Sequence, residues 1–235
     1  MNNENQFELK ISDVPKIERP NKRLKIVGSN TFEYEIFKLV DETDPILSEP
    51  AQAYDFDNPI IEPAYLALSL IETMRKKFGI GIAAPQVGLS TRVVALGGFD
   101  DRSPSYVMFN PIILESSGEV VMKEGCLSYP GLFLNVKRES TVKVAWFDAA
   151  QKPQEREFTG LTARIVLHEL DHLDGVCFTR LVPKVSLDIA KGKVKANLKK
   201  LKKQNDAERK KELMATAMKN LYLEGLKNKQ APDLL

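Results

Sequence analysis

The chain contains two histidines, and both lie in one short segment, His168-Glu169-Leu170-Asp171-His172. Side chains four residues apart on an α-helix lie on the same face, so we expect the two imidazoles to point in the same direction. A divalent ion held by both rings would lie beside the carboxylate of Glu169, which could then accept a proton from a water molecule. The segment therefore predicts a metal-binding helix and favours metal-assisted hydrolysis.

The same helix is also expected to belong to the core. Apolar residues recur around the histidines, namely Leu161, Ile165, Val166 and Leu170. An ordinary buried helix that carries two histidines is the structural alternative to the metal site. The two interpretations are compatible, because one helix can bury some side chains and present others as ligands.

A hydrolytic metal needs a third protein ligand besides an open position for water. The carboxylates beyond the histidines lie in a lysine-rich stretch that is expected to form a solvated helix, where a rigid ligand is not expected; they are Asp188, Asp206, Glu208 and Glu212. Of the two cysteines, Cys177 has apolar neighbours and is expected to be a small buried hydrophobe. Cys126 follows a strand-like run, where we expect a loop of the kind that often carries functional residues. Cys126 is therefore the candidate third ligand.

The composition fits a single compact enzyme with tails, because 43% of the 235 residues are hydrophobic. Two cysteines without a signal peptide argue against a disulfide framework and for a reducing compartment. No apolar run is long enough to span a bilayer. We therefore expect a soluble, cytoplasmic protein that does not bind a membrane.

The coarse pattern of helices and strands predicts the fold class. A helix is expected from Pro63 to Phe78, with proline in its first turn and Gly79 as its cap. Between it and the histidine helix, strand-like runs dominate: Arg92 to Leu96, Tyr106 to Phe109, Ile112 to Glu115, Glu119 to Lys123, Leu132 to Val136, Thr141 to Phe147 and Glu155 to Thr159. The last two are expected to pair as a hairpin. This pattern predicts an α+β fold with antiparallel sheets packed around a central metal-binding helix.

Three motifs, in this order, resemble those of the peptide deformylase family. They are Gly79-Ile80-Gly81-Ile82-Ala83-Ala84-Pro85-Gln86, then Glu124-Gly125-Cys126-Leu127-Ser128, then the histidine segment. The resemblance runs from about Ile36 to about Val182, with smaller agreements at Asp44-Pro45-Ile46-Leu47 and Asn110-Pro111. It implies a metal-dependent hydrolase that removes the formyl group from the N-terminal formyl-methionine of nascent polypeptides and releases formate.

The resemblance also implies a role for each site residue. Cys126, His168 and His172 would hold one divalent ion per chain, with Fe²⁺ as the physiological ion and Zn²⁺, Ni²⁺ or Co²⁺ as other occupants. Glu169 would move the proton. The Gln86 side-chain amide and the Leu127 backbone N–H would donate to the developing oxyanion. The substrate backbone would lie beside Gly81 and Gly125, and the methionine pocket would be lined by Ile80, Leu161 and Ile165.

Two residues depart from the family's usual pattern. Ile82 stands where leucine is usual, a near-isosteric change that a packed segment should tolerate. Leu167, directly before the first histidine, stands where glutamine is common. A hydrogen bond near the metal helix is therefore expected to be lost, which bears on the surroundings of the ligands and not on the ligands themselves.

The chain is expected to have three parts. Residues 1–35 are polar and of mixed charge, and are expected to form a partly disordered arm. Residues 36–183 would form the deformylase catalytic domain. Residues 184–235 hold fourteen Lys or Arg and six Asp or Glu, a net charge of +8, whereas the rest of the chain carries −6. Apolar residues at helical spacing predict a Lys-rich helical extension there; they are Leu187, Val194, Leu198, Leu201, Leu213, Ala217 and Leu221.

This basic extension has two interpretations. One is a solvated helix that packs back on the core. The other is contact with the ribosome, because the resemblance implies that some relatives dock there through a C-terminal helix, and a basic segment attracts RNA phosphate. The expected partners are formyl-methionyl nascent peptides and, in the second interpretation, the ribosome. No sequence-specific nucleic acid is expected.

Two other classes of function remain open. A zinc endopeptidase with the same helix motif would need a downstream carboxylate ligand and would leave Cys126 free. A non-catalytic binding module would use the metal structurally and contact RNA through its basic tail. Structural sites are usually closed by four protein ligands, and no fourth is evident nearby.

Overall fold

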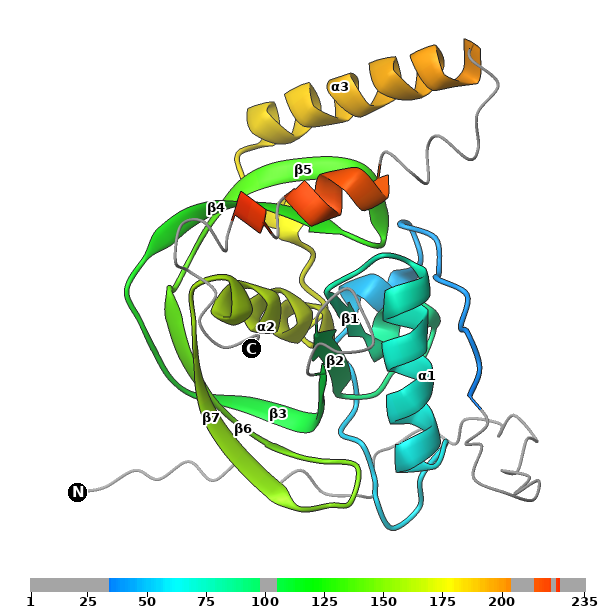
Figure 1. The fold of residues 1–235 in the computed structure, drawn as a ribbon, viewed down its shortest axis with the longest axis vertical. Helices are drawn as coiled ribbons and strands as arrows, with labels where there is room; N and C mark the ends of the chain where they lie inside the picture. The colour runs from blue at the N-terminus through cyan, green and yellow to red at the C-terminus, as the bar shows by residue number, and fades with distance from the viewer. Residues whose placement is uncertain (1–33, 98–104, 204–213, 221–222, 225–235) are drawn as a thin grey trace.

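In the computed structural model, helix α2 (Gly160–Leu173) lies in the middle of the fold, with a five-stranded sheet and a separate hairpin around it (Figure 1). The sheet has the order β1-β2-β3-β6-β7, with bounds Gly81–Ala83, Val93–Gly97, Ser105–Ser117, Thr141–Phe147 and Pro153–Thr159. The hairpin consists of β4 (Val120–Cys126) and β5 (Tyr129–Arg138), and all neighbouring strands are antiparallel. The predicted α+β class is confirmed. The structure describes residues 34–97, 105–203, 214–220 and 223–224.

Helix α1 (Pro63–Lys76) forms where it was predicted, and its apolar stripe of Leu66, Leu70 and Met74 is buried. Its end differs from the prediction. The left-handed residue that terminates it is Phe78, with φ 58°, and not Gly79. The Gly79 N–H instead donates to the Met74 carbonyl at 2.9 Å, which satisfies one of the last free carbonyls of the helix.

Two strands differ from the sequence pattern. The runs on either side of Asn110-Pro111 belong to one continuous strand, β3, which stays in the sheet through a register shift between Phe109 and Ile112. Such an irregularity accommodates a proline that cannot donate to the ladder. The glycine-bearing first motif, expected as a loop, contributes the short strand β1 and then a 3-10 helix, Ala84–Val87.

The predicted core role of the histidine helix is confirmed, because Leu161, Ile165, Val166 and Leu170 are all buried in one cluster with residues of β2, β3, β6 and β7. The two departures from the family pattern are buried as well. Ile82 is fully buried beside α1, and Leu167 packs within the α2 cluster. Both side chains therefore pack in the apolar core.

Helix α3 (Lys184–Lys203) begins at the first residue of the predicted extension and packs on β5 through Leu187, Ala190 and Val194. The arm as far as residue 33, together with Leu213 and Leu221 of the predicted stripe, lies outside the described residues, and so does the side chain of Leu201. Within the described ranges, no helix combines the length and apolar character needed to cross a bilayer.

Candidate metal centre

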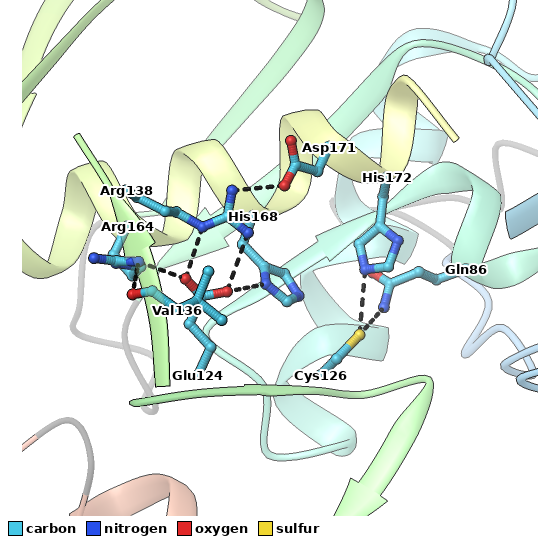
Figure 2. Close-up of polar contacts among 9 residues, drawn as sticks. All are labelled: Gln86, Glu124, Cys126, Val136, Arg138, Arg164, His168, Asp171 and His172. Atoms are coloured by element: carbon cyan, nitrogen blue, oxygen red, sulfur yellow. Dashed lines mark hydrogen bonds and ion pairs between the residues drawn. The ribbon is translucent and has the colours of Figure 1, made fainter. Parts of the chain in front are cut away.

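The two histidines are presented on one face of α2. The helix follows β7 directly, and Gly160 adopts a φ of 58° at the junction, a value that glycine takes without strain. Figure 2 shows His168 and His172 projecting from adjacent turns toward Cys126, with ring centroids 5.1 Å apart. Both side chains are buried.

Cys126 comes from the opposite side, as the last residue of β4. Because Cys126 still belongs to the strand, the expectation that it lies in a loop beyond the strand is wrong. Its side chain is buried. The register of the hairpin shifts between Gly125 and Cys126, an irregularity of the kind that redirects a side chain. The Cys126 Sγ lies 3.2 Å from His172 Nε2. One ligand atom from each of Cys126, His168 and His172 lies within 4.8 Å of the others.

The charges within this triad favour the thiolate. Burial opposes ionisation of Cys126, but the charge of His172 and hydrogen bonds from both histidines hold the pKa of the thiol well below its usual value. Burial also opposes a charged His172, but the nearby thiolate raises the pKa of this imidazole to about 10. The thiolate is the form that binds metal, and metal binding releases the protons that the ligands carry.

The three side chains fit a bound transition-metal ion. One thiolate and two imidazoles are the ligands preferred by Zn²⁺, Fe²⁺, Co²⁺ and Ni²⁺, whereas Mg²⁺ and Ca²⁺ prefer oxygen. His168 Nδ1 lies 2.9 Å from Glu124 Oε2, so its Nε2 remains for an ion. Three protein ligands leave one position of a tetrahedral site open, which is the arrangement of catalytic centres.

Glu124 orients His168 and is itself held by two arginines. Arg138 donates to both carboxylate oxygens, from Nε at 2.7 Å and from Nη2 at 3.1 Å, and Arg164 donates from Nη1 at 2.8 Å (Figure 2). Burial disfavours the charged carboxylate, but the hydrogen bonds from His168 and Arg138 outweigh it and hold the pKa of Glu124 below its usual range. Arg138 also donates to Asp171 at 2.6 Å. Hydrogen bonds of this kind fix the tautomer and orientation of a ligating histidine.

Sequence reasoning missed this network. Arg164 carried a signal, because it is the one charged residue in the apolar first turns of α2 and precedes His168 by a single turn. Arg138 carried none, since it stands among charged residues at the end of β5 and only the hairpin brings it to Glu124.

Glu169 lies beside the triad in a tight setting. Its side chain is buried, its Oε2 has no hydrogen-bond partner among the described residues, and burial raises its pKa to about 7. A Cβ at Gly81 would collide with the Glu169 carboxylate, so the glycine of β1 is required by close approach. A carboxyl group with a pKa near neutrality can both accept and return a proton.

The two predicted oxyanion donors lie next to Cys126. Gln86 is buried in the 3-10 helix after β1, where its Oε1 accepts from the Ala83 N–H at 2.8 Å. That bond turns its Nε2 toward Cys126 Sγ at 3.4 Å and Ser128 Oγ at 3.1 Å. Leu127 follows Cys126 directly and is buried.

A cavity of about 60 Å³ opens beside the centre. All five residues predicted to contact substrate line it, namely Ile80, Gly81, Gly125, Leu161 and Ile165. Four of the six residues predicted to bind metal or take part in catalysis line it as well, namely Cys126, Leu127, His168 and Glu169. The other two, Gln86 and His172, are not among the described residues that line it. Met218, which no sequence argument singled out, also lines it.

An α+β fold that buries a Cys-His-His triad, with an acidic side chain beside it and a cavity in front, defines a metal-dependent hydrolase. Comparisons with known proteins give the family. The sequence model of the polypeptide deformylase family matches residues 36–186. The chain therefore belongs to this family, whose reaction is the metal-dependent removal of the N-terminal formyl group from nascent peptides.

Individual proteins similar to this chain are also peptide deformylases. The peptide deformylase of Prochlorococcus marinus (strain NATL1A) is 40% identical over 57% of this chain and 74% of its own. The crystal structure of a peptide deformylase from Legionella pneumophila has a TM-score of 0.65 and 31% identity, and the match covers 74% of this chain and 99% of that one. The Met-Ala-Ser-bound peptide deformylase of Acinetobacter baumannii has a TM-score of 0.57 and 31% identity, over 63% of this chain and 99% of that one.

Proposed function

We propose that Cys126, His168 and His172 hold one divalent ion and that Glu169 moves the proton when this chain deformylates a formyl-methionyl peptide. The observation that carries the proposal is the meeting of three ligand atoms within 4.8 Å, from two elements far apart in sequence. When bound, the ion would supply Lewis-acid activation of the carbonyl and of the attacking water.

The chain's own residues account for the remaining steps. Glu169 takes a proton as a water oxygen attacks the formyl carbon, and it returns that proton to the nitrogen as the carbon–nitrogen bond breaks. Formate and a free amino terminus result. Gln86 Nε2 and the Leu127 N–H donate to the carbonyl oxygen as its negative charge grows.

Strand β1 gives a physical basis for binding many different peptides. It is an edge strand of the sheet, so an extended peptide can pair with it through main-chain hydrogen bonds, which do not depend on side-chain identity. Ile80, Leu161 and Ile165 line the cavity next to it and provide apolar walls for one methionine side chain. The Met-Ala-Ser bound by the Acinetobacter baumannii relative is a peptide of this kind.

An assay with two substrates tests this function against the endopeptidase alternative. Formyl-Met-Ala-Ser should be hydrolysed and casein should not, and Cys126→Ala should lose the first activity. Cleavage of casein that survives Cys126→Ala would overturn the proposal, because an endopeptidase would not need the thiolate.

The physiological ion of this proposal is Fe²⁺, with Zn²⁺, Ni²⁺ or Co²⁺ as occupants that the same ligands accept. The site of action is the cytoplasm, where nascent chains emerge. Metal analysis of protein purified without oxygen should find iron as the principal metal. Zinc as the principal metal would overturn this assignment.

Contact with the ribosome through α3 is the last part of the proposal. The helix holds eight lysines and one aspartate. Leu187, Ala190 and Val194 pack on β5, whereas the lysines from Lys184 to Lys200 are exposed. A basic face of this kind attracts RNA phosphate in a salt-dependent manner.

A further inference from the structure

One wall of the substrate cavity comes from outside the catalytic region. Met218 lines the cavity, whereas the other described residues that line it lie between Ile80 and Glu169. It belongs to a short helix, residues 214–220, drawn in red-orange above α2 in Figure 1. A segment beyond α3 in the chain therefore returns to the catalytic centre.

This short helix has an apolar face and a polar face. Met214, Ala217 and Met218 are half-buried, whereas Thr216 and Lys219 are exposed. Residues three and four apart share one face of a helix, so these half-buried side chains form a continuous contact surface. The helix is therefore oriented with its apolar side toward the protein.

Met218 brings to the cavity the same side chain that the substrate brings. A methionine side chain is flexible and fits irregular apolar pockets, and Ile80, Leu161 and Ile165 provide such walls. Because Met218 is part of the same chain, its effective concentration at the cavity is high compared with that of a free peptide.

With Met218 in place, the cavity is too small for a peptide. Its volume is about 60 Å³, whereas pockets that bind small-molecule ligands measure about 300 Å³ or more. Glu169, which also lines the cavity, is only 4% exposed. A formyl-methionyl peptide needs more room than this cavity offers.

We propose that helix 214–220 covers the substrate cavity through Met218, and that a formyl-methionyl peptide must displace this helix in order to bind. Met218 then sets the apparent affinity for substrate without taking part in the chemistry. This inference rests on the proposed function, because it assumes that the cavity is where the peptide binds.

Three full-length, metal-loaded variants test the cover. Met218→Ala removes the side chain that fills the cavity, Met218→Leu keeps an apolar side chain of similar volume, and Thr216→Ala alters an exposed position of the same helix. If the covered state holds about nine tenths of the molecules, Met218→Ala should lower KM for formyl-Met-Ala-Ser about tenfold at nearly constant kcat. Met218→Leu and Thr216→Ala should keep the parent KM.

A binding measurement that needs no turnover accompanies the kinetics. Isothermal titration with Met-Ala-Ser should show a lower Kd for Met218→Ala by the same factor as KM. An unchanged or raised KM and Kd in Met218→Ala would overturn the cover, since Met218 would then be a neutral or supporting wall. Failure of the proposed function looks different, because no protein, the parent included, would then release formate from formyl-Met-Ala-Ser.

Discussion

We propose that three side chains hold the ion and that a fourth moves a proton, and alanine substitutions separate these roles. Cys126→Ala, His168→Ala and His172→Ala should each lose bound metal, because three protein ligands are the fewest that hold a catalytic ion firmly. Glu169→Ala should keep the metal and lose about 10²- to 10⁴-fold in turnover, the usual contribution of a general acid–base group. Metal analysis and formate release on the purified variants give both quantities. Full metal content in Cys126→Ala would contradict the ligand assignment.

Glu124 is the buried anion on which the charge network depends. Glu124→Gln would leave the buried Arg164 without its carboxylate partner and Arg138 with Asp171 alone. Breaking a buried ion pair on one side costs about 3–5 kcal/mol. We expect a loss of that order in the free energy of unfolding, measured by urea denaturation. We also expect weaker metal binding, since His168 would lose its charged partner.

An exposed ion pair provides the matched control. Glu119 pairs with Lys137 at 2.6 Å, and both side chains are 62% exposed. Glu119→Gln removes the same charge from a solvated site and should cost at most about 1 kcal/mol. Equal losses of unfolding free energy in Glu124→Gln and Glu119→Gln would show that burial of the Glu124 network contributes little to stability.

At the scale of elements, the C-terminal end of α2 is fixed by Gly175. This residue has φ 69°, and a Cβ added to it would lie 2.8 Å from backbone atoms of Ser48 and Glu49. Gly175→Ala should therefore combine the strain of a left-handed residue, about 1–2 kcal/mol, with a backbone collision that displaces the segment packed against the metal helix.

Gly131 in the β4–β5 hairpin isolates the first of these two effects. It has φ 79°, but nothing lies within 4 Å of an added Cβ. Gly131→Ala should lower Tm only by the backbone strain, and Gly175→Ala should lower it clearly more. Thermal unfolding of both variants measures the difference. Equal decreases in Tm would show that the collision at Gly175 does not contribute to the loss of stability.

At the scale of the whole molecule, α3 combines a packing face with a basic face. Because Leu187 and Val194 pack on β5, deleting the extension would uncover apolar surface, so surface substitutions are the cleaner test. Changing the exposed Lys195, Lys199 and Lys200 together to Gln should weaken co-sedimentation with ribosomes at low salt and leave hydrolysis of formyl-Met-Ala-Ser intact.

The control for this prediction is an equal change of charge elsewhere. Lys76, Lys77 and Lys152 are exposed lysines outside α3, and their joint replacement by Gln should leave co-sedimentation nearly unchanged. If both triple variants pellet as the parent does, the basic face of α3 has no part in ribosome contact.

Short-range pattern was enough to predict several parts of the protein. The spacing of His168 and His172, the buried stripe of α1 and the pairing of β6 with β7 all follow from contacts between residues that are close in sequence. Covalent geometry fixes which neighbours share a helix face or a strand face, so these features need no knowledge of the fold. The motif resemblance added the family and its reaction.

Only the tertiary structure decided the surroundings of the site. Strand β1 is three residues long and is defined by its pairing with β2, so no local pattern marks it. Glu124 meets Arg164 and His168 across 40 and 44 residues of sequence, and Met218 reaches a cavity built by other elements. Such contacts depend on how whole elements pack, because side chains distant in sequence meet only after sheets, helices and hairpins have taken their places.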